Sequence, residues 1–248
     1  MCASPSRQTD PARWAWLLLA SRVLALLAAQ ALIVAGLTWS GTAEPLWSSA
    51  AWWPVAATIA NLAGLALLGW RLRAEGVSYR ALLAPQTGSR RHGGAAAFGL
   101  LPVLVVAGVV PSMWIGTMLW GDPATGQSLL RGPLPGWAAL VALLLFPITT
   151  AAVELPTYAG YVLPRLRTAG VPAIAAIAVV GLALGIQHGA LPFLPASKFF
   201  LWRTLMFVPL GVSLVGAVAW RPRLLPWFVA MHLALVGWWG YQLWRAAG

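Results

Sequence analysis

The sequence predicts an all-α, polytopic integral membrane bundle of about seven transmembrane helices, and three observations support this prediction. Of the 248 residues, 60% are hydrophobic and only 8% are charged, whereas soluble domains carry roughly 45–50% apolar and about 25% charged residues. The apolar residues gather in runs close to the ~20 residues that cross a hydrocarbon core. Sixteen tryptophans and nineteen prolines are also typical of membrane bundles, where indoles favour the interface and prolines are tolerated.

Seven apolar runs are the expected helices. In order they cover residues 16–39, 51–70, 95–120, 136–163, 171–194, 199–220 and 224–244. The first run is long, contains Arg22 and is followed by further runs, so we interpret it as an uncleaved anchor rather than a signal peptide. The longest connection, residues 71–94, is expected to form a loop with a short surface helix. Without an internal repeat, residues 1–248 are expected to form a single membrane domain.

The arginines predict the orientation, because positive charge accumulates in cytoplasmic loops. A cytoplasmic N-terminus places eleven arginines on that side: Arg7, Arg13, Arg71, Arg73, Arg80, Arg90, Arg91, Arg165, Arg167, Arg221 and Arg223. The opposite side keeps Arg131, Lys198 and Arg245. Arg22 and Arg203 lie near run ends and are expected to reach the lipid headgroups. The arginine-rich, lysine-poor composition indicates a bacterial inner (cytoplasmic) membrane.

The formal charge of +11 predicts a partner with negative charge. The arginines stand between apolar runs, where they meet anionic headgroups, so we expect membrane lipids and no nucleic acid as partners. The single cysteine, Cys2, excludes an intrachain disulfide and a multi-cysteine metal site.

Three titratable residues inside apolar runs are the candidate functional residues. Four of the five acids lie in loops or tails: Asp10, Glu44, Glu75 and Asp122. Glu154 is the remaining acid, and His188 and His232 lie in the fifth and seventh runs. An ionised residue at mid-membrane costs roughly 3 kcal/mol or more, so such residues are usually paired and functional.

The surroundings of these residues add detail and leave alternatives open. Pro156 has no N–H and clashes with the carbonyl of Ala152, so a kink or break that exposes polar backbone is expected beside Glu154. His188 follows glycines spaced by four and is expected to face protein. Alternatively, Glu154 is a helix-end acid near the interface, and the two histidines only hydrogen-bond between helices. That interhelical role is also expected for Asn61, Gln187 and Thr204.

The three residue types are suited to hydrolysis. A buried glutamate can take a proton from water while an imidazole donates to a developing oxyanion, which describes amide hydrolysis without a covalent nucleophile. Alternatively, Glu154, His188 and His232 bind one divalent metal, such as zinc, that activates the water. No HExxH helix is present. The sequence leaves both possibilities open.

Three short motifs resemble those of a known family. ELPTYAGYVLPRL, residues 154–166, resembles the first motif of the CPBP family (CAAX proteases and bacteriocin-processing enzymes, also called Abi), usually E-E-x-x-x-R-G-Y-L-x-P-x-L. LGIQH (184–188) resembles F-x-x-x-H, and HLALV (232–236) resembles H-x-x-x-N/D. The resemblance covers residues 136–240, which would form the catalytic core, whereas residues 1–135 hold the N-terminal spans and the basic loop.

The resemblance implies an intramembrane endopeptidase that cuts peptides or membrane-anchored proteins. In the family, the first glutamate and first histidine are thought to activate water, and the later histidine helps to form an oxyanion pocket. These roles would pass to Glu154, His188 and His232.

Four motif positions depart from the family pattern. Leu155 replaces the second glutamate, Ala159 the arginine, Leu184 the phenylalanine, and Val236 the asparagine or aspartate. A missing oxyanion donor costs about 2.7–4 kcal/mol in barrier height. The departures favour one alternative, a catalytically impaired relative acting as an immunity or assembly factor. A second alternative is a proton-coupled transporter, although the chain lacks repeat symmetry and a second intramembrane acid.

Overall fold

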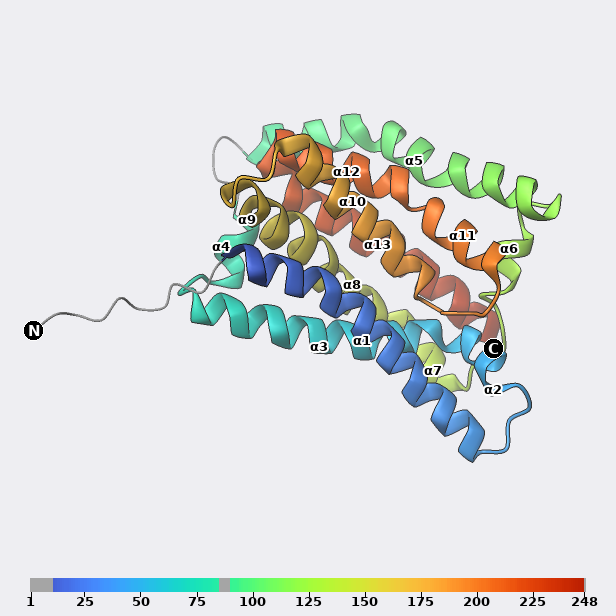
Figure 1. Cartoon of the computed structure of the whole chain (residues 1–248). Coiled ribbons are helices and arrows are strands. Elements are labelled where there is room, and N and C mark those ends of the chain that lie inside the picture. Colours follow the sequence, from blue (N-terminus) through green and yellow to red (C-terminus); the bar gives the residue numbers. More distant parts are fainter. Residues whose placement is uncertain (1–10, 85–89, 248) are drawn as a thin grey trace, which may run out of the picture.

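The structure, a computed structural model, describes residues 11–84 and 90–247 and confirms the all-α class, because these residues contain no strand. Within these two ranges, six helical stretches are long and apolar enough to cross a membrane: Ala12–Trp39, Pro45–Ala74, Gly93–Trp120, Gly136–Thr168, Ser197–Trp220 and Pro222–Ala246. The chain is therefore a polytopic integral membrane bundle, and its tilted helices run between two ends (Figure 1). Cys2, Arg7, Asp10 and Pro85 lie outside the described residues.

The long helices are interrupted by short segments of other helical types. The α-helices are α1 (Pro11–Trp39), α2 (Pro45–Ser48), α3 (Trp53–Ala74), α4 (Tyr79–Leu83), α5 (Arg90–Trp120), α6 (Thr125–Ser128), α7 (Gly136–Leu140), α8 (Phe146–Leu155), α9 (Leu163–Thr168), α10 (Ala173–Gly189), α11 (Ser197–Leu205), α12 (Val208–Trp220) and α13 (Leu225–Ala247). The 3-10 turns are η1 (Ser49–Trp52) and η4 (Pro222–Leu224), and the π-helical segments are η2 (Val141–Leu145) and η3 (Pro156–Val162). Helix α4 confirms the expected surface helix in the long connection.

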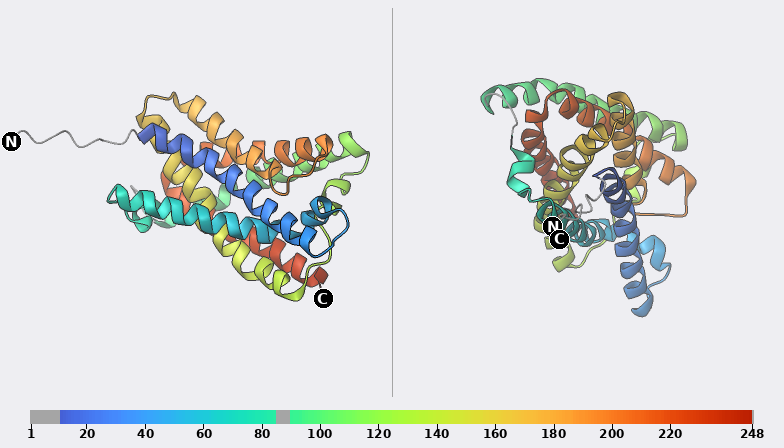
Figure 2. Two further views of the ribbon diagram at one scale, coloured as in Figure 1. Left: turned by 60° about the horizontal axis from the view of Figure 1, so that its bottom comes forward. Right: turned by 60° about the vertical axis from the view of Figure 1, so that its left-hand side comes forward.

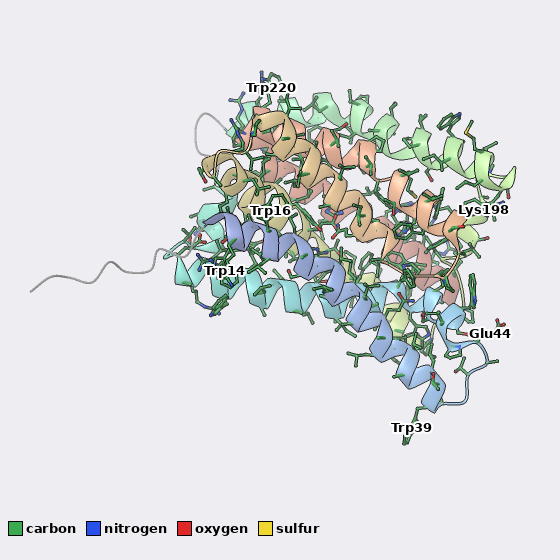
Figure 3. All side chains as sticks on the ribbon, in the orientation of Figure 1. Trp14, Trp16, Trp39, Glu44, Lys198 and Trp220 are labelled. Atoms are coloured by element: carbon green, nitrogen blue, oxygen red, sulfur yellow. The ribbon has the colours of Figure 1, made fainter. Side chains whose placement is uncertain are left out.

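The helix ends separate into an arginine-rich end and an opposite end. The C-terminus of α3, α4, α9 and the start of α13 lie together at the first end (Figure 1). Trp14, Trp16 and Trp220 lie toward this end, whereas Trp39, Glu44 and Lys198 lie toward the other (Figure 3). Tryptophans at both ends are typical of the two interfaces of a membrane protein.

Helix α8 lies in the interior of the bundle and packs against α3 and α13, whereas α5 lies at the periphery beside α11 and α12 (Figure 2). The following segment η3 is also buried, and Tyr158, Ala159, Tyr161 and Val162 are almost fully enclosed. Polar side chains carried by α8 therefore face other helices.

The fifth apolar run departs from the expected single span. Helix α10 ends at Gly189, and residues 190–196 leave the helix. The side chain of Gln30 donates to the Phe193 carbonyl at 2.8 Å and accepts from the Phe193 N–H at 2.6 Å. Arg203 donates from Nε to the Leu191 carbonyl at 3.2 Å. The sequence prediction is wrong for residues 190–194, because Pro192 cannot continue the hydrogen-bond ladder and side chains satisfy the freed backbone instead.

Close glycine contacts set the position of α10 against α12. A Cβ atom at Gly185 would lie 2.4 Å from Val208 Cγ2, and one at Gly181 would lie 2.6 Å from Val212 Cγ2. Only the absence of a side chain lets the two backbones approach this closely. The glycine face therefore packs inside the protein, as the sequence predicts.

The helix does not break at Pro156. Pro156 keeps helical dihedral angles (φ −58°, ψ −39°), and the chain widens into the π-helical segment η3. The Ala152 carbonyl, which the proline leaves without its usual donor, accepts a hydrogen bond from the Tyr79 hydroxyl at 2.5 Å. The expected break is thus corrected to a widened turn, whose free carbonyl is satisfied from the surface helix α4.

We expect Gly185→Ala to destabilise the bundle by about 1–3 kcal/mol, because the added methyl group overpacks the contact with Val208. Gly216→Ala on α12 is the matched control, since its Cβ would lie 3.8 Å from Ile177. Thermal unfolding in detergent measures both variants. Equal unfolding temperatures for Gly185→Ala and the control would contradict the prediction.

Tyr79→Phe is expected to cost about 1–2 kcal/mol, because it leaves the Ala152 carbonyl without a donor. Burial raises the pKa of Tyr79 to about 12, so the hydroxyl remains a donor and the loss should be constant between about pH 6 and pH 9. Tyr241→Phe, at an exposed tyrosine, is the control. A chemical-denaturation series across this pH range tests the prediction, and a loss that disappears at either limit would count against it.

Candidate functional site

Glu154 is the centre of a buried polar cluster contributed by α1, α3, α8, α10 and α13. Glu154 lies near the end of α8, and the residue is only 6% exposed. Helix α8 is flanked by the π-helical segments η2 and η3, and such segments occur frequently at functional sites.

One oxygen of Glu154 is held firmly. Gln187 donates from Nε2 to Oε2 at 2.8 Å, and Arg22 Nη2 lies 3.7 Å from the same oxygen. Gln187 Oε1 accepts from Arg22 Nε at 2.9 Å and from the Tyr158 hydroxyl at 3.0 Å. Two donors on Gln187 Oε1 require its NH₂ group to face Glu154. The network thus fits an ionised carboxylate, which only accepts.

The other oxygen of Glu154 faces a histidine. His232 Nε2 on α13 lies 3.6 Å from Oε1, slightly beyond hydrogen-bond distance. Within the described part of the chain, this is the only hydrogen-bond or ion-pair contact of Oε1. The buried His232 Nδ1 has no hydrogen-bond partner among the same residues. The two carboxylate oxygens are therefore inequivalent, and Oε1 is the less engaged of them.

His188 is oriented by its own helix. Its Nδ1 lies 2.6 Å from the Leu184 carbonyl. Because a carbonyl only accepts, Nδ1 carries the hydrogen, and Nε2 of the neutral ring is an acceptor. The ring stacks on Phe207 with centroids 3.7 Å apart and lies near enough to Glu154 for electrostatic interaction. The structure thus gathers all three predicted residues into one region and confirms that His188 faces protein.

Arg22 belongs to this cluster and does not reach the headgroups, which corrects the sequence interpretation. It is 4% exposed, and its Nη2 also donates to Asn61 Oδ1 at 3.0 Å. Asn61 in turn donates to Thr150 at 2.8 Å and to Thr149 at 3.3 Å. A signal was present in the sequence, because Arg22 lies eleven residues after the start of α1, or about 16 Å along a helix. That depth exceeds the reach of a snorkelling side chain.

Arg203 on α11 is also buried and does not reach the headgroups, contrary to the sequence interpretation. It is 6% exposed, and besides its bond to the Leu191 carbonyl its guanidinium lies over Phe207 (5.1 Å) and Trp53 (5.7 Å). Thr204 lacks the expected interhelical hydrogen bond within the described residues, and its hydroxyl instead lies against Gly189. Asn61 and Gln187 do form the expected interhelical bonds.

The geometry does not favour the metal alternative. Among residues 11–84 and 90–247, no three histidine, cysteine, aspartate or glutamate side chains are arranged to hold a metal ion. Glu154 Oε2 is already engaged by a guanidinium and an amide, and the Nδ1 of His188 by a carbonyl. A cation at Glu154 would also meet the charge of Arg22, which opposes its binding. In this arrangement Glu154, His188 and His232 form a carboxylate that lies near two imidazoles.

The last position of the third motif, four residues after His232, is Val236, whose side chain cannot donate a hydrogen bond. Val236 lies one turn beyond His232 and is buried in an apolar cluster with Phe146 and Leu26. His232 therefore has no amide or carboxylate neighbour from its own motif.

No protein-family model matches the chain, and neither a curated protein nor a solved structure matches it significantly.

Proposed function

We propose that the chain is an intramembrane endopeptidase of the CPBP type, which hydrolyses peptide bonds of membrane-associated proteins or peptides with a glutamate-activated water. The observation that carries this proposal is the inequivalence of the Glu154 oxygens. Oε2 is held by Gln187 and Arg22, whereas Oε1 is directed toward His232. A base with one fixed oxygen and one less engaged oxygen is suited to take a proton in a defined direction.

In the proposed reaction, Glu154 Oε1 takes a proton from water as the oxygen of that water attacks the peptide carbonyl carbon. His188 Nε2 accepts the second hydrogen of the water and orients it, because Nδ1 is occupied by Leu184. His232 donates from Nε2 to the oxyanion of the tetrahedral intermediate. The C–N bond then breaks, and the proton held by Glu154 passes to the leaving amine. The products are a carboxylic acid and an amine, which balances the added water.

The depth of the site suggests where substrates enter. His232 lies seven residues after the start of α13, or about 10 Å from the arginine-rich end. We place this end on the cytoplasmic side of a bacterial inner membrane, because eleven arginines would then lie in cytoplasmic segments. Substrate peptides would reach Glu154 from that side, and lipids would surround the bundle.

The second candidate function is a non-catalytic immunity or assembly factor with the same fold. The observation that favours it is the apolar, buried Val236, which leaves His232 without a second oxyanion donor. Among the residues that the structure describes, no contact in the cluster specifically favours proton-coupled transport, since the carboxylate is paired with a cation that does not exchange protons in proteins.

Glu154→Gln is the decisive variant for the protease proposal. We expect a loss of peptide cleavage of about 10²–10⁴-fold, because a neutral amide cannot act as the base. His232→Ala should lower kcat by about 10²–10³-fold through loss of the oxyanion donor. The assay incubates the full chain in proteoliposomes with membrane-anchored peptides and identifies the products by mass spectrometry.

Glu75→Gln is the matched control, since Glu75 is bonded to Arg165 and Tyr161 outside the cluster. Cleavage by Glu154→Gln at the rate of the unsubstituted chain would refute the proposed role of Glu154. A folded chain that cleaves no peptide, combined with a cellular phenotype that survives Glu154→Gln, would favour the non-catalytic alternative.

A further inference from the structure

We propose that Arg22 is a positioning residue for the reaction, so that helix α1 forms part of the active site although all three motifs lie in residues 136–240. This inference rests on the proposed function. Arg22 would act through Glu154, by holding the carboxylate ionised and leaving Oε1 as its reactive oxygen.

Three contacts fix the guanidinium of Arg22. Its Nε donates to Gln187 at 2.9 Å, and its Nη2 donates to Asn61 at 3.0 Å while lying 3.7 Å from Glu154 Oε2. The planar fork of an arginine can bind several partners in fixed directions, whereas a lysine supplies a single point charge. Arg22 therefore sets both the charge and the orientation of Glu154, directly and through Gln187.

The network braces α8 at two levels one turn apart. Arg22 contacts Glu154 directly, and Asn61 transmits a second contact from Arg22 to Thr150. Because Thr150 and Glu154 are separated by four residues, they lie on the same face of α8. A rotation of α8 about its axis would break both contacts, so Arg22 restricts the direction in which the carboxylate points.

The pairing also follows from electrostatics. Among the described residues, Glu154 is the only carboxylate within ion-pair distance of Arg22. Ala159 stands where the resembled motif has an arginine, and it is enclosed in the apolar core. No arginine of the motif segment forms an ion pair with Glu154 in the described residues. A buried carboxylate without a nearby cation is strongly disfavoured, and α1 supplies that cation.

The sequence leaves room for the guanidinium at Gly64 on α3. A Cβ atom there would lie 3.4 Å from Arg22 Nη1 and 3.1 Å from Val153 Cγ2. A methyl group at position 64 would therefore press on Val153, the residue next to Glu154, and would lie in ordinary van der Waals contact with the guanidinium. Gly64 thus offers a way to shift Glu154 slightly relative to Arg22 without removing either charge.

The first experiment compares Arg22→Lys and Arg22→Gln by steady-state kinetics in proteoliposomes. Arg22→Lys keeps the charge and should remain folded, but kcat should fall about 10²-fold with KM within about twofold, as expected when a reacting group is misplaced by roughly 1 Å. Arg22→Gln should lose more activity. The acidic limb of its pH dependence should move to higher pH, because a carboxylate without its cation binds a proton more readily.

The charged or titratable groups around the Glu154 carboxylate are Arg22 from α1, Tyr158 from η3, His188 from α10, Arg203 from α11 and His232 from α13. Only Arg22 is changed in the variants, so a shifted limb reports its contribution. A residue with a purely structural role would lower the amount of folded protein without moving this limb.

Gly64→Ala provides a second test that does not depend on the folding of the arginine variants. We expect a several-fold fall in kcat, because the added methyl group presses on Val153 and moves the adjacent Glu154 relative to the guanidinium by a few tenths of an ångström. Gly36→Ala on α1 is the control, since nothing lies within 4 Å of the added methyl group, and it should leave kcat unchanged.

Folded Arg22→Lys or folded Gly64→Ala with kcat within twofold of the unsubstituted chain would overturn the inference. A thermal double-mutant cycle of Arg22→Gln and Glu154→Gln needs no enzymatic activity. It therefore separates failure of this inference from failure of the proposed protease function. If the chain cleaves no peptide, the cycle still shows whether the two residues are coupled. Additive shifts in unfolding temperature would refute the pairing itself.

Discussion

The burial of one ionised carboxylate among apolar helices is the constraint on which the rest of the arrangement depends. A medium of low polarity stabilises Glu154 only if a cation and hydrogen-bond donors surround it. These groups come from helices far apart in the sequence, with Arg22 on α1 and Gln187 on α10 separated by 165 residues. The helices therefore take positions that bring hydrogen-bond donors and a cation to the Glu154 carboxylate while their apolar faces pack together. In water, by contrast, solvent would satisfy much of this requirement.

Helix α10 shows how packing and polarity combine. Its glycines allow the close approach of α12, which brings α10 to a fixed depth and rotation. At that rotation Gln187 points to Glu154, and His188 stacks on Phe207 just after α11. Neither contact requires the rest of the fifth apolar run to be helical. The chain leaves the helix after Gly189, and Gln30 and Arg203 satisfy the freed backbone of this segment.

Much of the fold was predictable from the sequence, because run length and composition are strong signals in a membrane protein. The helical class and the long apolar segments follow directly, although the described residues form six long spans and the shorter helix α10. The rarity of intramembrane titratable groups points to Glu154, His188 and His232 as candidates. Long-range partners were not predictable in this way. Arg22 lies in the middle of α1, but its pairing with Glu154 depends on the rotation of two helices. The widened turn at Pro156 depends on Tyr79, a residue from another element that happens to reach the freed carbonyl.

The two long-range contacts of α1 have a consequence for membrane insertion. Arg22 and Gln30 find Gln187 and Phe193 only after more than 160 further residues have been synthesised. A nascent α1 thus enters the bilayer with only early partners to follow, Asn61 for Arg22 and Ser49 for Gln30, and an unpaired arginine costs roughly 3 kcal/mol. The other, apolar residues of α1 must offset this cost during insertion. The final position of α1 in the bundle is reached late, when the C-terminal helices have been inserted. Helix α1 therefore completes its contacts only after α10 and the segment that follows it have been synthesised.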